Sequence, residues 1–266
     1  MKYKRVVLFL LVVVLLVVVS SRVNPEAARR EPNDVENTLL NMTTPNPDDL
    51  PEETPEPTPE PTPNIREILP GISVFDWELK LVNNVNVLPN TFVPPETVEI
   101  EKDGRMVCFD SRAVEPLRDM IADAREEGFS VRISSAYRPY SEQAYTFFGK
   151  ASQIAWGGEV SYEQAEILAR SIVAYPGTSE HQTGLCADLI DSADTEMNAE
   201  ACENMPLLVW LREHCAEYGF IARYPKNKQE ITGWYEPWHF RYVGVEAAEY
   251  IMENDLCLEE FIQLFY

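Results

Sequence analysis

The chain has only three histidines, and two of them lie near carboxylates at spacings that suit a metal site. His181 precedes Asp188 by seven residues, with Gly184 between them to permit a turn, and His239 follows Glu236 by three. Catalytic zinc takes three protein ligands and keeps a position open for water. His181, Asp188 and His239 would supply the ligands, which leaves Glu236 as a general base. On residue types alone, coincidental grouping stays an open alternative.

Geometry places a condition on Glu236 and His239. Residues three apart on a straight strand point to opposite faces of the sheet. A helix would bring the two side chains together, but Pro237 is unfavourable in a helix interior. We therefore expect the chain to bend at Glu236-Pro237, so that both side chains reach one cavity.

The third histidine, His214, has different neighbours in the sequence. It shares the apolar face of a predicted helix with Leu207, Leu211 and Tyr218. This pattern predicts a satisfied core histidine rather than a metal ligand.

The elements that must position these residues are short and of both types. Strands are expected where apolar residues alternate, and helices where they recur at helical spacing and end at glycine. Strands are predicted at 129–133, 187–190 and 238–243, a hairpin at 98–109, and helices at 113–127, 161–173, 207–218 and within 245–264. This mixture predicts an α+β fold, a small mixed or antiparallel sheet with flanking helices that holds a single zinc site.

Three regions divide the chain. Residues 1–23 begin with basic side chains and continue in an apolar run that is too short for the ~30 Å hydrocarbon core, so they predict a signal peptide or a retained membrane anchor. Residues 24–70 are rich in Pro, Glu and Thr and predict a disordered linker with polyproline II character. Residues 71–266 are predicted to form the catalytic domain.

Composition excludes one class of function. The net charge of the 266 residues is −22, which argues against binding a phosphate backbone, so no nucleic-acid partner is expected. Five cysteines allow at most two disulfides. Cys186 shares a strand face with Asp188 and is expected to be a buried free thiol near the metal.

Three stretches of sequence resemble the VanY-type zinc D-alanyl-D-alanine carboxypeptidases. They are SSAYRPYSEQ at 134–143, PGTSEHQTGLCADL at 176–189, and YGFIARYP with EPWHFRYVG at 218–225 and 236–244. The family pattern is Ser-x-His-x-x-Gly-x-Ala-x-Asp followed by Glu-x-x-His. The positions that match it are Ser179, His181, Gly184, Ala187, Asp188, Glu236 and His239.

The resemblance implies a role for each matched residue. His181, Asp188 and His239 are expected to bind Zn²⁺. Glu236 is expected to activate the zinc-bound water and then to pass the proton to the leaving amine. Arg138 is expected to stabilise the oxyanion. The expected substrate-binding residues are Ser135, Tyr137, Gln143 and Ser179, the last of which also shapes the His181 loop.

The activity that the resemblance implies is that of a zinc metallo-carboxypeptidase. A D,D-carboxypeptidase would remove the terminal D-Ala from peptidoglycan stem peptides outside the cytoplasm, either anchored in the membrane or secreted to the cell wall. The alternatives are an L,D-carboxypeptidase on tetrapeptide stems, a non-catalytic cell-wall-binding protein and, less favoured, an endopeptidase. Serine-type motifs of the Ser-x-x-Lys and Gly-x-Ser-x-Gly kinds are absent. A monomer is expected.

Overall fold

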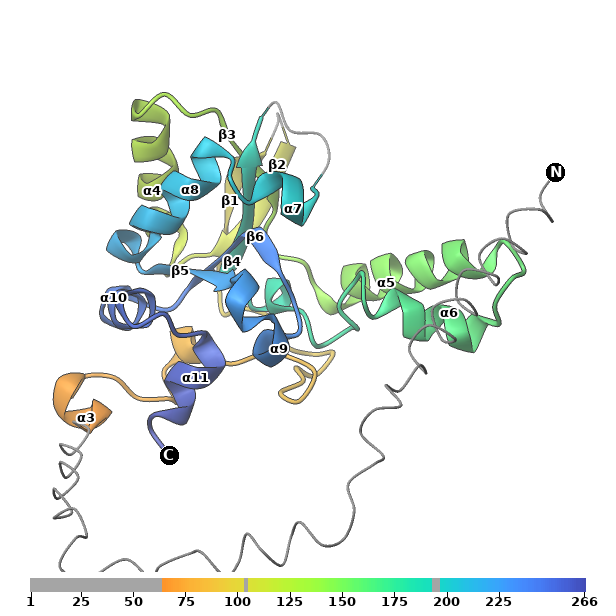
Figure 1. The fold of residues 1–266 in the computed structure, drawn as a ribbon, viewed down its shortest axis with the longest axis horizontal. Coiled ribbons are helices and arrows are strands. Elements are labelled where there is room, and N and C mark those ends of the chain that lie inside the picture. The colour runs from red at the N-terminus through yellow and green to blue at the C-terminus, as the bar shows by residue number, and fades with distance from the viewer. Residues whose placement is uncertain (1–63, 103–104, 193–196) are drawn as a thin grey trace, which may run out of the picture. The chain divides into compact units, whose positions relative to one another are not determined.

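A four-stranded antiparallel sheet carries most of the predicted site residues. The computed structural model describes residues 64–102, 105–192 and 197–266. The strands are β3 (Val131–Ser135), β4 (Cys186–Asp191), β5 (Phe220–Tyr224) and β6 (Glu236–Tyr242), and they pair in the order β3-β4-β6-β5. The predicted hairpin is also present as β1 (Thr97–Lys102) and β2 (Arg105–Asp110) (Figure 1). The α+β prediction is confirmed.

Helices flank this sheet. The α-helices are α3 (Ile65–Ile68), α4 (Val114–Glu126), α5 (Tyr140–Ala155), α6 (Tyr162–Ala169), α7 (Ala199–Cys202), α8 (Pro206–His214), α9 (Gln229–Thr232), α10 (Val245–Glu253) and α11 (Leu258–Gln263). The short 3-10 helices among the described residues are η3 (Trp77–Leu79), η4 (Glu180–Thr183), η5 (Cys215–Tyr218) and η6 (Lys226–Lys228). Helices α4 and α8 lie together on one side of the sheet (Figure 1).

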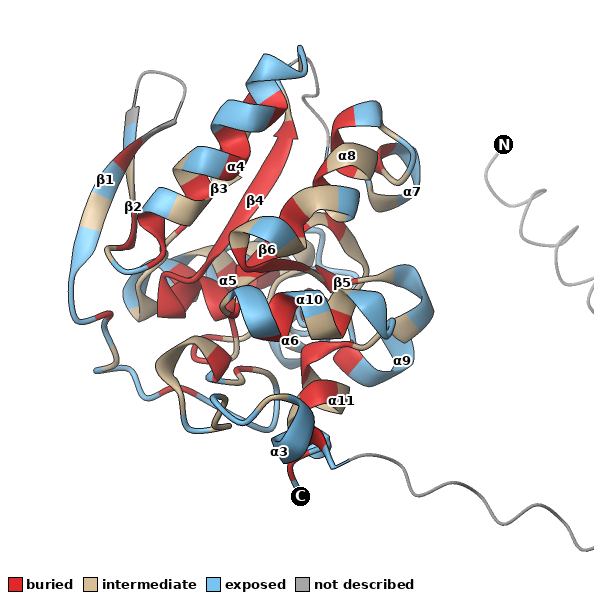
Figure 2. Cartoon of the chain, turned by 90° about the vertical axis from the view of Figure 1, so that its left-hand side faces the viewer, coloured by how far each residue is buried: buried red, intermediate tan, exposed pale blue. Residues whose placement is uncertain are grey.

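The alternation of side chains along β4 separates core from site. Ala187 and Leu189 point into the larger apolar core, which also takes residues of α4 and α8. Cys186 and Asp188 therefore point to the opposite face of the sheet, although both are buried. Figure 2 shows β4 buried along almost its whole length. A second core, which includes Ile221 and residues of α10 and α11, lies beside this opposite face.

Helices α5 and α6 form an arm that projects from the rest of the described domain (Figure 1). The arm has a small apolar core of its own, made by Phe147, Ala151 and Ala169. The sequence analysis did not identify α5. A helical stripe is nevertheless present in its sequence, because Tyr140, Ala144, Phe147, Ala151 and Ile154 recur at helical spacing.

Three predicted helices differ from expectation, and the one predicted at 207–218 is α-helical only to His214 and 3-10 over Cys215–Tyr218. Helix α6 stops at Ala169 rather than near residue 173, and the Ser171 hydroxyl donates to the Leu168 carbonyl just past its end, a local bond that competes with helix continuation. The segment 245–264 is divided into α10 and α11, because Asp255 adopts a left-handed conformation with φ 50°.

His214 is not a core residue, contrary to the prediction. Its side chain is 39% exposed, stacks on Trp210 and lies 2.7 Å from Glu217 Oε1, because it faces outward at the end of α8. Ile65, in the range expected to be linker, is buried in the second core, so the packed domain begins before residue 71. No disulfide joins the five cysteines, and all five lie among the described residues.

The predicted signal or anchor at 1–23 and most of the predicted linker lie outside the described residues. In the part of the chain that the structure describes, no helix is long and apolar enough to cross a membrane.

Candidate active site

The pairing of β4 with β6 brings two of the predicted zinc ligands together. Asp188 stands directly opposite His239 in the antiparallel register, so both side chains leave the same face of the sheet. Asp188 Oδ1 lies 2.9 Å from His239 Nδ1, and Asp188 Oδ2 lies 3.3 Å from His181 Nε2. The carboxylate of Asp188 therefore lies between the two imidazoles.

The loop before β4 delivers His181 to this carboxylate. His181 belongs to η4, which ends at Gly184 in a left-handed conformation with φ +73°, as the glycine between histidine and aspartate predicted. The backbone carbonyl of Ala136 lies 2.7 Å from His181 Nδ1, and a carbonyl can only accept. Nδ1 must therefore carry the ring proton in a neutral His181, which leaves Nε2 to face the cluster.

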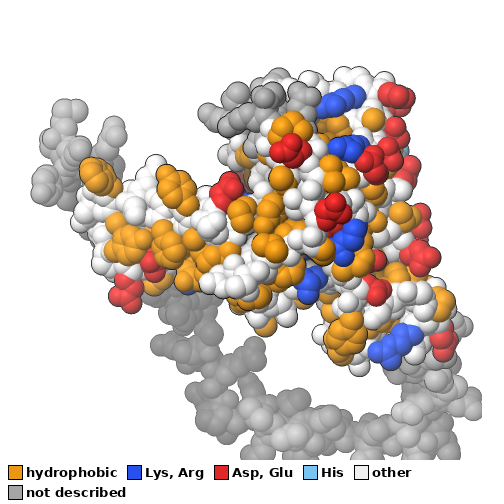
Figure 3. Space-filling view, turned by 180° about the vertical axis from the view of Figure 1, so that it is seen from behind, with side chains coloured by type: hydrophobic (Ala, Val, Ile, Leu, Met, Phe, Trp, Pro, Cys, Tyr) orange, Lys and Arg blue, Asp and Glu red, His pale blue; other side chains and the backbone are white. Residues whose placement is uncertain are grey.

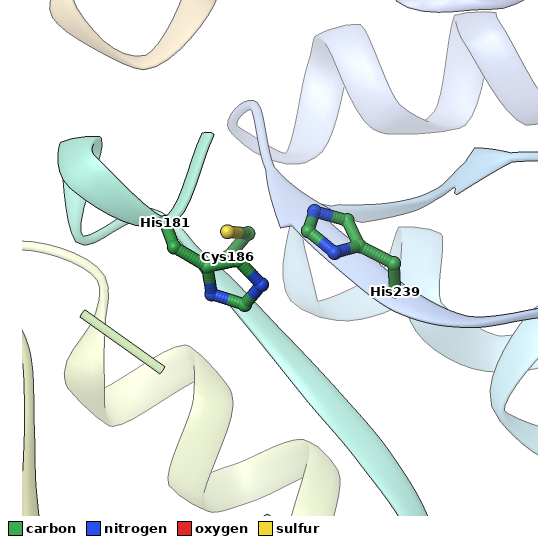
Figure 4. Close-up of side chains that lie close together, drawn as sticks. All are labelled: His181, Cys186 and His239. Atoms are coloured by element: carbon green, nitrogen blue, oxygen red, sulfur yellow. The ribbon is translucent and has the colours of Figure 1, made fainter. Parts of the chain in front are cut away.

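Cys186 is a fourth potential donor. His181, Cys186 and His239 each offer a ligand atom, and these atoms all lie within 4.8 Å of one another. Figure 4 shows the Cys186 thiol next to the His181 ring, with the His239 ring approaching both from the neighbouring strand. The sequence analysis expected Cys186 to be a buried free thiol near the metal, and its side chain is indeed buried there. The cluster thus offers two imidazoles and two candidate third ligands, Asp188 and Cys186.

Glu236 meets the geometric condition that its spacing imposed. Ala222 and Tyr224 are two residues apart in β5, whereas their partners in β6, Phe240 and Glu236, are four residues apart. This irregularity accommodates extra residues in β6, as a β-bulge does, and changes the direction of the Glu236 side chain. Glu236 Oε2 consequently lies 3.7 Å from the Nδ1 atom of the histidine three residues later. The predicted bend is confirmed, and burial raises the pKa of the Glu236 carboxyl above its usual range.

The electrostatics of the cluster favour positive charge at its centre. Burial opposes protonation of His181, but Cys186 and Asp188 outweigh it and raise the imidazole pKa to about 9. The pKa of His239 is likewise raised, because the nearby acidic groups outweigh burial. Burial also opposes ionisation of Asp188, yet His181 and His239 hold the pKa of that carboxyl well below its usual range.

These groups fit a divalent metal. The acidic side chains favour positive charge between the two imidazoles, and a doubly charged cation would supply it. Imidazole nitrogens with one carboxylate oxygen or one thiolate make a donor set that zinc favours.

A cavity of about 240 Å³ opens over the cluster. Of the residues predicted from sequence, those that line it are Arg138, Ser179, His181, Asp188, Glu236 and His239. The guanidinium Nε of Arg138 is buried and has no hydrogen-bond partner among the described residues. Trp234 and Trp238 form part of the wall, and Thr146 of α5 closes the side nearest the arm.

The structure does not bring Ser135, Tyr137 or Gln143 into this cavity. Ser135 pairs with Asp188 in the β3–β4 ladder. Gln143 is fully buried and donates through Nε2 to the Ala174 carbonyl at 2.6 Å, which ties α5 to the segment after α6. Gln143 therefore stabilises the arm's attachment and does not face a ligand in the cavity.

Among the cavity-lining residues to which the sequence assigned no role, Glu180 and Tyr224 lie close to the His239 ring. The ring centroid of Tyr224 lies 4.9 Å from that of His239. Glu180 is buried and ion-paired to Arg223 and Arg241. The sequence did indicate such an ion pair, because Arg223 and Arg241 lie inside apolar strand sequences and a buried arginine requires an acidic partner.

Comparisons with known proteins agree with this arrangement. Residues 107–245 match the family VanY: D-alanyl-D-alanine carboxypeptidase. A D-alanyl-D-alanine carboxypeptidase of Enterococcus faecalis is 38% identical over 190 residues, which cover 70% of this chain and 66% of that protein.

Two solved structures are similar to the described domain. One is a vancomycin-resistance D,D-pentapeptidase VanY mutant in complex with Zn(II), with 37% identity and a TM-score of 0.59 over 70% of this chain and 99% of that one. The other is the LD-carboxypeptidase LdcB, whose structure concerns peptidoglycan recognition, with 36% identity and a TM-score of 0.61 over 70% of this chain and 86% of that one. With the Ser, His and Asp of its Ser-x-His-x-x-Gly-x-Ala-x-Asp motif and the Glu and His of its Glu-x-x-His motif at one cavity, the chain belongs to the VanY family of D-alanyl-D-alanine carboxypeptidases.

Proposed function

We propose that this protein is a zinc-dependent D,D-carboxypeptidase that removes the terminal D-Ala from peptidoglycan stem peptides. The observation that carries the proposal is the meeting of His181, Asp188, Glu236 and His239 with Arg138 at one cavity of about 240 Å³. A binding protein would need the shape of this cavity but not a carboxylate beside the metal ligands. Membership of a carboxypeptidase family supports the same conclusion.

His181, Asp188 and His239 are the residues that would hold zinc, which would act as a Lewis acid on the scissile carbonyl. Glu236, 3.7 Å from a ligand nitrogen, would accept a proton at Oε2 from the attacking water. The same oxygen would return the proton to the amine of the departing D-Ala. The Arg138 guanidinium would stabilise the negative charge that develops on the carbonyl oxygen.

Specificity separates two candidate activities. The D,D activity is favoured because both the matching family and the enterococcal relative are D-alanyl-D-alanine carboxypeptidases. The L,D reading has its own support, since the described domain is equally similar to LdcB. In the first case the substrate ends in D-Ala-D-Ala, and in the second it is the tetrapeptide that remains after the first cleavage.

The substrate implies a location outside the cytoplasm. We propose that residues 1–23 direct or anchor the chain for export and that residues 24–70 act as a spacer to the catalytic domain. The bulk negative charge of −22 is consistent with a peptide substrate rather than a nucleic acid.

The test uses the purified full chain loaded with zinc. It is incubated separately with a stem pentapeptide ending in D-Ala-D-Ala and with the corresponding tetrapeptide, and released D-Ala is quantified by mass spectrometry. We expect release from the pentapeptide, its loss with a chelator, and its recovery when zinc is restored. Release from the tetrapeptide alone would move the assignment to the L,D activity.

Glu236→Gln is the matched variant for this test. It preserves the size of the side chain but removes the base, so we expect kcat to fall by roughly 10²–10⁴-fold with one zinc ion still bound. Turnover that persists in the variant would contradict the role of Glu236. Binding to isolated cell walls without any turnover by the parent protein would support the non-catalytic alternative.

A further inference from the structure

Behind the cluster lies a buried ion-pair network that no step of the proposed reaction uses. Glu180 is 1% exposed, and its Oε1 atom accepts hydrogen bonds from Arg223 Nε at 2.8 Å and from Arg241 Nη1 at 2.9 Å. Both arginines are fully buried. Burying three charges is costly unless each is paired, so this network requires a reason beyond packing.

The second oxygen of Glu180 points at a predicted zinc ligand. Glu180 Oε2 lies 3.6 Å from His239 Nε2. Neither atom has a hydrogen-bond partner among the described residues, and both are buried. The separation is slightly longer than a hydrogen bond.

The opposite edge of the His239 ring faces the cluster. Nδ1 lies 2.9 Å from Asp188 Oδ1 and 3.7 Å from Glu236 Oε2. A zinc ligand must be an unprotonated nitrogen. Ligation through Nδ1 therefore leaves the ring proton on Nε2, directed at Glu180.

We propose that Glu180 is a positioning residue that fixes the Nε2–H tautomer of His239 and thereby presents Nδ1 to the metal. This inference rests on the proposed zinc site. It makes the two histidine ligands complementary, because His181 donates Nδ1–H to the Ala136 carbonyl and presents Nε2. A carboxylate that orients a ligating imidazole in this way strengthens metal binding.

The two arginines fix the orientation of Glu180 itself. Arg223 is held by a bidentate pair with Glu259 of α11, at 2.8 and 2.7 Å. Arg241 donates through Nη2 to the carbonyls of Glu78 and Lys80, at 2.8 and 3.0 Å. Residues 78, 80 and 259 lie outside the segment 107–245 that matches the family. Residues near both ends of the described domain thus hold the two arginines that orient Glu180 behind His239.

Glu180→Gln is a selective test because the arginines orient the new amide. Arg223 and Arg241 only donate, so the Gln oxygen must face them and the amide NH₂ must face His239 Nε2. Two donors then oppose each other, and the Nε2–H tautomer is disfavoured. The matched control is Glu259→Gln, which weakens the ion pair that holds Arg223 without facing the histidine.

The first measurement is the zinc dissociation constant of the full chain, determined by competition with a chromophoric chelator. We expect Glu180→Gln to weaken zinc binding about 10–100-fold, and Glu259→Gln to change it less than about threefold while lowering the thermal unfolding temperature. Equal zinc affinity in Glu180→Gln and the parent chain, or equal losses in both variants, would overturn the proposal.

The second measurement reads the tautomer directly and does not depend on any variant folding. The chain has three histidines, so long-range ¹H–¹⁵N correlation spectra of the ¹⁵N-histidine-labelled, zinc-loaded protein can be assigned. We expect His239 to carry Nε2–H and His181 to carry Nδ1–H. A proton on His239 Nδ1 would overturn the proposal. Because neither measurement uses turnover, loss of the carboxypeptidase assignment would leave both results interpretable.

Discussion

The sheet wall of the cavity and the arm formed by α5 and α6 are built in opposite ways. On the sheet wall, charged side chains are buried and tied to one another, as in Glu180 with Arg223 and Arg241. On the arm, by contrast, large aromatic side chains lie in solvent: Tyr145 is 82% exposed and Trp156 is 93% exposed. Figure 3 shows hydrophobic side chains gathered over this arm.

This contrast indicates where the molecule is rigid. A buried, mutually paired charge cannot move without losing its partner, so the sheet wall holds its side chains in fixed positions. The arm is held by the core of Phe147, Ala151 and Ala169, with Arg170 stacked 4.1 Å from the centre of the Tyr175 ring. Substitutions on the sheet wall should therefore change metal binding and chemistry, whereas those on the exposed arm should change neither.

The largest effect is expected at the third metal ligand. Asp188→Asn keeps the side-chain shape but removes the negative charge between the imidazoles, so we expect zinc to be lost and turnover to be abolished. Cys186→Ser is the matched variant on the same strand face, and we expect it to retain zinc. The metal content of each purified full chain, measured by inductively coupled plasma mass spectrometry, checks both expectations.

The reverse pattern would change the assignment. If Cys186→Ser lost zinc and Asp188→Asn retained it, the ligand set would be His181, Cys186 and His239, the three residues whose donor atoms lie within 4.8 Å. The rigid wall would then bind metal through a thiolate, and Asp188 would act only as a partner for the two rings.

A smaller effect is expected at Arg138, which approaches the cavity from the loop between β3 and α5. Arg138→Gln removes the positive charge near the reacting carbonyl, so we expect kcat to fall on the order of 10²–10³-fold while zinc affinity stays the same. Steady-state kinetics with the stem pentapeptide, paired with zinc titration, check this prediction. A kcat within threefold of the parent would show that Arg138 does not stabilise the transition state.

The chemistry of the site could be predicted from sequence better than its surroundings. His181, Asp188, Glu236 and His239 are local in two motifs, and the constraint that Pro237 imposes on the strand correctly predicted a bend. The hairpin, α4 and the strands β3 and β4 also followed from short-range patterns of glycine and alternating apolar residues.

What sequence patterns did not predict depends on contacts between distant residues. Gln143 lies in the motif that resembles the family, yet its side chain bonds to Ala174 instead of facing the cavity. Glu180 was visible in the motif, but its importance depends on Arg223 and Arg241, which meet it only when β5 and β6 pair. His214 was predicted to be buried because helical periodicity does not say where the neighbouring surface ends.

The smallest effect is expected at the tip of the arm. Trp156→Ala removes a side chain that is 93% exposed, so the free energy of unfolding should change by less than about 0.5 kcal/mol, and zinc affinity and pentapeptide turnover should not change. Phe147→Ala, in the helix α5 that Trp156 follows, removes a fully buried side chain and should cost about 3–5 kcal/mol of the arm's stability. Urea unfolding of the arm, followed by hydrogen exchange of α5 amides, compares the two variants.

A loss above about 1 kcal/mol in Trp156→Ala would mean that this ring is covered in the full chain, because a solvent-exposed side chain has little contact to lose. The contrast between the sheet wall and the arm would then fail at the arm, while the paired charges on the sheet wall would stand as described.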